Sequence, residues 1–135
     1  MVEIEARPYG PDSSPEELGA LRQRARIVAD GIASYREIPV VTEFTINLLF
    51  DWLAALEPPV HTLILDLSVG GRPDSVARKI LRQRLLGLSE LKCIRVVFEA
   101  NLLVKVAFKF VVGSAFGKVT HVHDSVEDAI KAALP

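Results

Sequence analysis

The most chemically suggestive stretch of the chain is residues 66–75, a polar loop that joins an apolar run to an amphipathic one. Its two glycines, Gly70 and Gly71, prompt comparison with phosphate-binding loops. The stretch lacks the Gly-Lys-Ser/Thr ending of a nucleoside-triphosphate loop and the three spaced glycines of a dinucleotide loop. A nucleotide site is therefore not expected, although a helix start here would still offer free backbone N–H groups to an anion.

The same loop predicts a surface that binds a partner or an anion. Ser75 follows Asp74 at the expected helix start, so either side chain could cap the helix. A phosphate on Ser75 would sit at a helix N-terminus with basic side chains nearby, where negative charge is stabilised. The residues expected to form the surface, with Ser75 as the phosphorylation candidate, are Ser68, Gly70, Gly71, Arg72, Asp74, Arg78 and Lys79.

Two further groups of residues could carry binding chemistry. His121 and His123 are two apart on an expected strand and share a face, but no spacing supplies a third metal ligand, so no metal is expected. Five basic residues lie in and after the loop without interleaved aromatic residues, which favours a solvated face over a nucleic-acid surface. An acidic protein partner is the second interpretation of this cluster, which comprises Arg72, Arg78, Lys79, Arg82 and Arg84.

Residues 102–116 form an unusually apolar segment, in which the residues up to Val112 leave only Asn101, Lys105 and Lys109 as a polar stripe. At helical spacing, this pattern is typical of a deeply packed helix. A dimer face and one wall of a pocket for an apolar ligand are the alternatives. The candidate residues for such a pocket or dimer face are Phe44, Trp52, Phe108 and Phe110.

Composition limits the class of protein. The 135 residues suit one domain, and 16 basic residues against 17 acidic ones give no overall attraction to nucleic acid. A single cysteine and the absence of a long apolar run indicate a cytoplasmic protein with no transmembrane segment. No catalytic set is marked by a motif, so neither an enzyme nor a cofactor is expected.

The N-terminal third contains a predicted strand, a predicted helix and a segment with several alternatives. Alternating residues predict a short strand over residues 2–7. Ser14, Pro15 and Glu17 then predict a capped helix start, because Ser14 can cap and Glu17 can complete a capping box. We expect this helix to end near Gln23. Residues 25–35 then fit a strand, a bent hairpin or a continuation of the helix to about residue 32.

The remaining chain alternates regularly between helices and strands. We expect helices over residues 43–56, 75–88, 102–116 and 125–134, the first capped by Thr42 and the last by Ser125, and buried strands over residues 61–68, 94–98 and 119–123. Helices between successive strands imply crossover connections. The predicted fold is therefore a single α/β domain with a mixed, mostly parallel β-sheet and helices packed on it.

Leu65-Asp66-Leu67-Ser68 ends an expected strand, and Asp74-Ser75 follows six residues later at a helix start. With this spacing the chain resembles the STAS domains, the anti-sigma-factor antagonists of sporulation, over about residues 25–134. In that family a strand ending in a Leu-Asp-Leu-Ser-like run precedes Asp-Ser-Ser-Gly at a helix start, and a partner kinase phosphorylates the first serine. Ser75 occupies that position here. Val76 and Ala77 replace the second serine and the glycine, a departure that resembles the divergent STAS-like branch associated with the lipid-binding SEC14-type fold.

The resemblance implies a non-catalytic regulatory or protein-interaction module. Its partner would be a regulatory kinase or an anti-sigma-like factor, and Ser75 would be the switch. The alternative hypotheses are a binding or sensing domain for an apolar small molecule or lipid, and a homodimeric structural domain.

Overall fold

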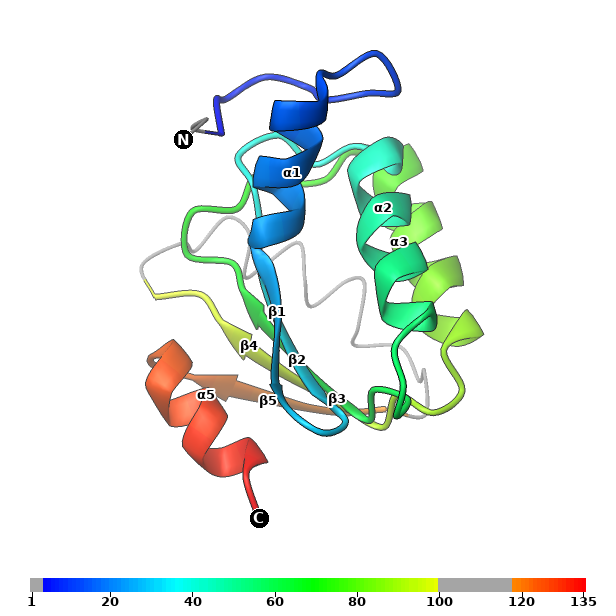
Figure 1. The fold of residues 1–135 in the computed structure, drawn as a ribbon. Helices are drawn as coiled ribbons and strands as arrows, with labels where there is room; N and C mark the ends of the chain where they lie inside the picture. The colour runs from blue at the N-terminus through cyan, green and yellow to red at the C-terminus, as the bar shows by residue number, and fades with distance from the viewer. Residues whose placement is uncertain (1–3, 100–117) are drawn as a thin grey trace.

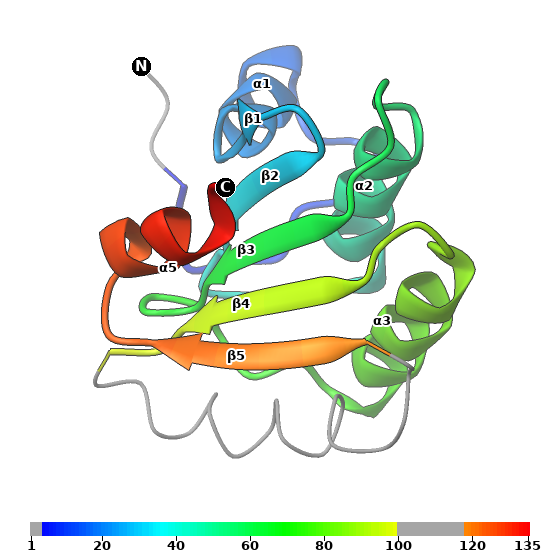
Figure 2. The ribbon, with the colours of Figure 1, turned by 90° about the horizontal axis from the view of Figure 1, so that it is seen from below.

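The computed structural model describes residues 4–99 and 118–135. Five strands form one mixed sheet in the order β1-β2-β3-β4-β5 (Figures 1 and 2). β1 and β2 are antiparallel, and every later pair is parallel. The predicted α/β fold with a mostly parallel sheet is therefore confirmed. The strands are β1 (Ala25–Ala29), β2 (Ile32–Arg36), β3 (Thr62–Asp66), β4 (Cys93–Val97) and β5 (Val119–His123).

Residues 25–36, where the sequence left several alternatives open, form a hairpin. The turn between β1 and β2 contains Gly31, whose φ of +78° suits glycine and strains other residues. A Cβ at Gly31 would also lie 2.4 Å from the ring of His61, so the tight turn packs against the start of β3. Asp-Gly is a typical hairpin turn, which explains why the preceding helix does not continue.

Helices cover both faces of the sheet. The helices in the described residues are α1 (Pro15–Gln23), α2 (Glu43–Ala54), α3 (Ser75–Gly87) and α5 (Val126–Ala133). Helices α2 and α3 lie side by side on one face, and α5 lies on the other (Figures 1 and 2). The predicted helix over residues 102–116 falls outside the described residues.

The two faces bury apolar cores of unequal size. The larger core joins α2 and α3 to inward-facing strand residues such as Leu63, Ile94 and Val96, which are fully buried. The smaller core places Ala129 of α5 on Ile64 and Val97. Side chains along a strand point alternately to the two faces of the sheet. Polar residues at every second position of a strand therefore share the α5 face.

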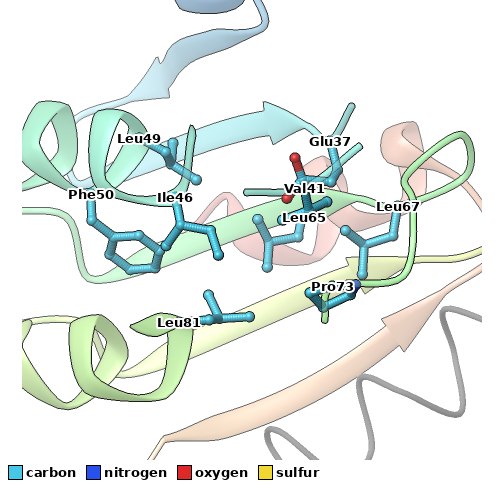
Figure 3. A pocket seen from close by; sticks show the side chains of 10 residues that line it. Glu37, Val41, Ile46, Leu49, Phe50, Leu65, Leu67, Pro73 and Leu81 are labelled. Carbon is cyan, nitrogen blue, oxygen red and sulfur yellow. The ribbon is translucent and has the colours of Figure 1, made fainter. Parts of the chain in front are cut away.

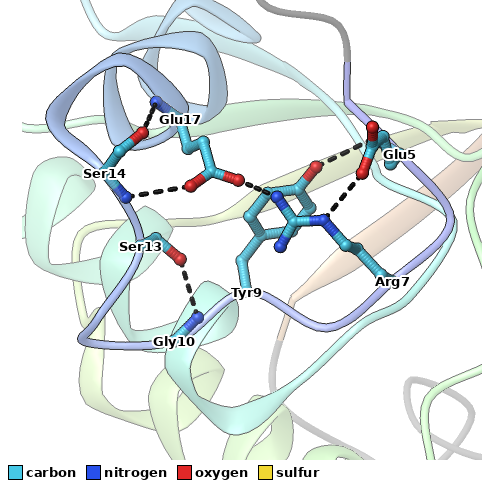
Figure 4. A network of polar contacts seen from close by, with 7 residues as sticks. All are labelled: Glu5, Arg7, Tyr9, Gly10, Ser13, Ser14 and Glu17. Atoms are coloured by element: carbon cyan, nitrogen blue, oxygen red, sulfur yellow. Dashed lines mark hydrogen bonds and ion pairs between the residues drawn. The ribbon is translucent and has the colours of Figure 1, made fainter.

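The helix starts follow the predicted caps. Ser14 and Glu17 form the reciprocal capping box, with Pro15 in the first turn (Figure 4). Thr42 caps α2, and the Ser125 hydroxyl accepts a hydrogen bond from the backbone N–H of Asp128 in α5. These side chains satisfy backbone N–H groups that have no partner inside the helix.

Two expectations about strands are wrong. Residues 4–7, the described part of the first predicted strand, pair with no strand. Instead the Glu5 N–H donates to the Tyr9 hydroxyl, and Arg7 contacts Glu5 and Glu17, which ties this segment to α1 (Figure 4). The last strand, expected to be buried, leaves Val119 and Val122 57% and 56% exposed, because β5 lies at the edge of the sheet.

In the parts of the chain that the structure describes, no helix has the length and apolarity required to cross a bilayer.

Candidate functional site

The loop after β3 begins with a turn that Asp66 stabilises. Asp66 Oδ1 accepts hydrogen bonds from the Ser68 N–H at 3.0 Å and from the Ser68 hydroxyl at 2.6 Å. Its Oδ2 lies 3.9 Å from Arg36 Nε, at the end of the neighbouring strand β2. Such a side-chain turn redirects the chain sharply away from the sheet and holds Ser68 at the start of the loop.

Gly70 and Gly71 bring the loop against the chain that leaves β2. The Gly71 N–H donates to the Ile38 carbonyl at 3.0 Å. A Cβ on Gly71 would lie 1.7 Å from the Pro39 carbonyl oxygen, and a Cβ on Gly70 would lie 3.0 Å from the Glu37 side chain. Glycine is therefore required at position 71, and a side chain at position 70 would force the Glu37 side chain to move.

Asp74, and not Ser75, caps α3. The Asp74 side chain accepts a hydrogen bond from the Ala77 N–H at 2.8 Å, and Ser75 is the first residue of the helix. The Ser75 side chain is exposed, and its hydroxyl has no hydrogen-bond partner among residues 4–99 and 118–135. Ser75 therefore has no role as a cap, which was the main structural explanation for a serine here.

This arrangement predicts different effects of two neighbouring alanine substitutions. Asp74→Ala should lower the free energy of unfolding by about 1 kcal/mol, the usual contribution of an N-cap. Ser75→Ala should change it by less than about 0.5 kcal/mol, as expected for an exposed residue without partners. Urea denaturation of both variants measures the difference. Equal losses, or a larger loss for Ser75→Ala, would show that Ser75 stabilises the helix start.

The loop and the first turns of α3 expose apolar and basic side chains together. Val69 and Val76 are 45% and 56% exposed, and Arg72 and Lys79 are also exposed. We call Val69, Arg72, Ser75, Val76 and Lys79 the Ser75 surface. Exposed aliphatic side chains rimmed by charge are typical of protein-binding surfaces.

One member of the predicted basic cluster points elsewhere. The Arg84 Nη2 lies 2.7 Å from Asp51 Oδ1, and its guanidinium stands over the Phe50 ring at 5.9 Å. This side chain joins α3 to α2, so it does not belong to the Ser75 surface.

A small apolar pocket lies between α2 and α3, beneath the loop (Figure 3). Its volume is about 40 Å³, far below the ~300–1,000 Å³ of typical ligand pockets. Phe50 lines it. Of the predicted pocket residues, Trp52 packs under the Arg22 guanidinium at 4.2 Å and Phe44 is only partly buried. Phe108 and Phe110 lie outside the described residues. The described pocket does not favour a lipid carrier.

Glu37, at the mouth of this pocket, is a residue that the sequence patterns did not mark. Its Oε1 accepts hydrogen bonds from the Ile38 N–H at 2.9 Å and from the Tyr35 hydroxyl at 3.3 Å. Burial raises the pKa of Glu37 to about 6, although these hydrogen bonds and the Arg24 charge oppose the change. No spacing rule identifies such a group, because its burial comes from the loop that packs across it.

His121 and His123 share a face of β5, as expected, with ring centroids 6.3 Å apart. However, Arg95 Nη1 lies 3.0 Å from His123 Nε2, so the arginine donates to the ring nitrogen that a metal would need. Burial and the Arg95 charge lower the pKa of His123. Among the described residues, no group of three or more His, Cys, Asp or Glu side chains is placed to hold a metal.

Comparison with protein-family models, curated proteins and solved structures gives no match for this chain.

Proposed function

We propose that the chain is a non-catalytic regulatory module that binds a protein partner through the Ser75 surface and is switched by phosphorylation of Ser75. The observation that carries this proposal is the position of Ser75. Its hydroxyl is exposed and unpartnered among the described residues, and it stands at the first position of a helix that another residue caps. The resemblance of this position to the phosphorylated serine of STAS domains supports the same role and suggests a cytoplasmic module.

The chemistry of the switch requires a partner kinase that supplies ATP. The Ser75 Oγ would attack the γ-phosphorus, the bond to the ADP oxygen would break, and a base of the kinase would accept the hydroxyl proton. The product adds close to two negative charges at the N-terminus of α3. This charge is stabilised there by the free backbone N–H groups and by Arg72 and Arg78, which are close in sequence.

Phosphorylation is expected to weaken binding of a partner that contacts the aliphatic part of the surface. Val76 is adjacent to Ser75 and 56% exposed, so a bound partner would bury both together. A phosphate in that contact would lose its hydration against apolar atoms, which is unfavourable. The unmodified protein is therefore the form that binds.

The test is mass spectrometry of the chain purified from its own host. We expect a fraction of the intact protein to carry one phosphoryl group, mapped to Ser75 by fragmentation. The modification should disappear in Ser75→Ala and persist in Ser89→Ala, a matched change at another exposed serine. Protein that stays unmodified through growth, starvation and stress would contradict the switch.

A photo-crosslinking residue at position 76 tests the binding part of the proposal. We expect it to capture one partner in cells, and we expect Ser75→Asp to reduce that capture. The same residue at position 134, which is exposed on the other face of the sheet, is the control. Equal capture at both positions would contradict a specific surface. An apolar molecule that native mass spectrometry finds retained, in monomer or dimer, would instead favour the carrier hypothesis.

A further inference from the structure

A polar hollow lies on the α5 side of the sheet, and none of its lining residues belongs to the Ser75 surface. Its volume is about 400 Å³, enough for a small molecule. The hollow sits where β2 ends at Arg36 and β3 ends at Asp66, with the first residue of α5, Val126, as part of its wall. In α/β sheets, small molecules bind at the carboxyl ends of parallel strands. Figure 2 shows α5 beside these strand ends.

Positive charge dominates the hollow. Three arginines line it, Arg24, Arg26 and Arg36, together with one carboxylate, Asp66. The strand pairing accounts for the grouping, because Arg26 is the register partner of Ser34 and Arg36 is the register partner of Asp66. The first-turn acids of α5, Glu127 and Asp128, do not line it. Two positive charges are therefore left without a balancing carboxylate among the lining residues.

The three guanidinium groups are held to different degrees. Arg24 Nε and Nη2 donate to the backbone carbonyls of Arg36 and Glu37 at 2.9 and 2.8 Å, which fixes its orientation. Arg36 approaches Asp66 at 3.9 Å, beyond hydrogen-bond distance. Arg26 is exposed and has no ion pair or hydrogen bond from its side chain within the described residues. Arg24 is therefore held in one orientation, whereas the guanidinium groups of Arg26 and Arg36 have N–H donors available to a ligand.

Ser34 adds an available hydroxyl to the wall of the hollow. This residue lines the hollow and is only 8% exposed, yet its hydroxyl has no hydrogen-bond partner in residues 4–99 or 118–135. The Ser34 oxygen is not among the fully buried atoms without a partner, so it is open to the hollow and can donate to a molecule there. Burial and the nearby Arg36 also lower the pKa of Arg24, as crowded positive charge does.

From these observations we infer that the hollow binds a small molecule carrying a phosphate group. Arg26 and Arg36 would donate to the phosphate oxygens, with Arg24 as a fixed third positive charge and the Ser34 hydroxyl as a further donor. The planar fork of arginine matches phosphate oxygens in pairs, which a lysine does not do. The volume accommodates more than a free phosphate ion, so the phosphate belongs to a larger molecule such as a nucleoside monophosphate.

The experiment is a titration followed by amide NMR spectra, with inorganic phosphate, adenosine 5′-monophosphate and adenosine as probes. We expect saturable shifts from the phosphate-bearing probes, centred on residues 24–36, 66 and 126, and none from adenosine. Tighter binding of the nucleotide than of inorganic phosphate would identify the larger class of ligand. The affinity should also fall as ionic strength rises. Adenosine binding alone, or no saturation by either phosphate probe, would overturn the inference.

Variants locate the binding site. Arg26→Gln and Arg36→Gln should each weaken binding about ten-fold or more, as loss of a charge-assisted hydrogen bond does. Both side chains are exposed enough that the fold should survive, which circular dichroism would verify. Ser34→Ala should weaken binding by a smaller factor. Arg72→Gln removes the same charge from the Ser75 surface and should leave affinity unchanged. Weaker binding by Arg72→Gln together with unchanged binding by Arg26→Gln would overturn the inference. That result would not affect the proposal that Ser75 is phosphorylated.

Discussion

Replacing Gly71 with alanine is expected to lower the free energy of unfolding by about 3 kcal/mol, the upper end for forcing extra atoms into a packed site. The added Cβ would lie 1.7 Å from the Pro39 carbonyl oxygen. The obstacle is backbone, so no side chain can rotate away. Either the loop or the segment after β2 must move, and the hydrogen bond from the Gly71 N–H to the Ile38 carbonyl should be lost.

Gly19→Ala is the matched control for this substitution. No atom lies within 4 Å of a Cβ built on Gly19, and the residue is inside α1. Alanine there should raise stability by about 0.5–1 kcal/mol through helix propensity. Guanidinium denaturation of both variants should therefore give changes of opposite sign. A Gly71→Ala protein as stable as the wild type would show that the loop does not pack against Pro39 as described.

The Gly71 variant also tests whether partner binding depends on where the Ser75 surface lies, because the substitution leaves the side chains of that surface unchanged. Ser75 itself is unchanged, but α3 begins four residues after Gly71, so its first turn should shift with the loop. We expect amide shifts concentrated in residues 37–39 and 68–76, with the α5 face unaffected. A partner that recognises this surface should then bind less tightly, although every side chain that it contacts is still present.

The elements that the sequence predicted well are those with local determinants. Ser14 with Glu17, Thr42 and Ser125 mark helix starts by side-chain hydrogen bonds within a few residues, and the structure confirms all three. The turn at Gly31 is also local, but a bent hairpin was only one of the alternatives that the sequence left open for residues 25–35. The parallel strands were predicted from their apolar runs, because a strand that is buried on both faces consists mainly of apolar residues.

The features that the sequence did not predict depend on contacts between distant segments. The N-terminal residues alternate like a strand, yet Arg7 and Tyr9 bind them to α1 instead. The hollow on the α5 face draws Arg26, Arg36 and Asp66 from three strands, and only the strand register brings them together. The basic cluster after the loop was apparent in the sequence, whereas this second group of arginines was not, because its members are scattered along the chain.

Glu37→Gln is expected to stabilise the protein at alkaline pH and to have no effect at acidic pH. Burial raises the pKa of Glu37 from 4.5 to about 6, so the folded state holds this proton more tightly than the unfolded state does. Below the unfolded pKa of 4.5 the carboxyl is neutral in both states. As pH rises through about 6, the buried group must ionise and stability falls. Glutamine does not titrate, so the variant avoids this loss.

The expected size follows from the same shift. A change in pKa from 4.5 to about 6 corresponds to about 2 kcal/mol at high pH. Glutamine keeps an oxygen that can accept from both the Ile38 N–H and the Tyr35 hydroxyl, as Glu37 Oε1 does, so packing should be preserved. Urea denaturation at pH 4 and pH 8 should therefore show the variant equal to the wild type at pH 4 and more stable at pH 8.

Two controls make the pH dependence specific to this carboxyl. Glu90→Gln changes an exposed glutamate and should give a small difference that is the same at both pH values. Arg24→Gln removes a nearby positive charge that favours the ionised carboxyl, so its destabilising effect should grow from pH 4 to pH 8. If Glu37→Gln were instead less stable at pH 8, the carboxylate would be ionised and stabilised by Arg24. The contact of Glu37 with Gly70 would then bring a negative charge beneath the loop that presents Ser75.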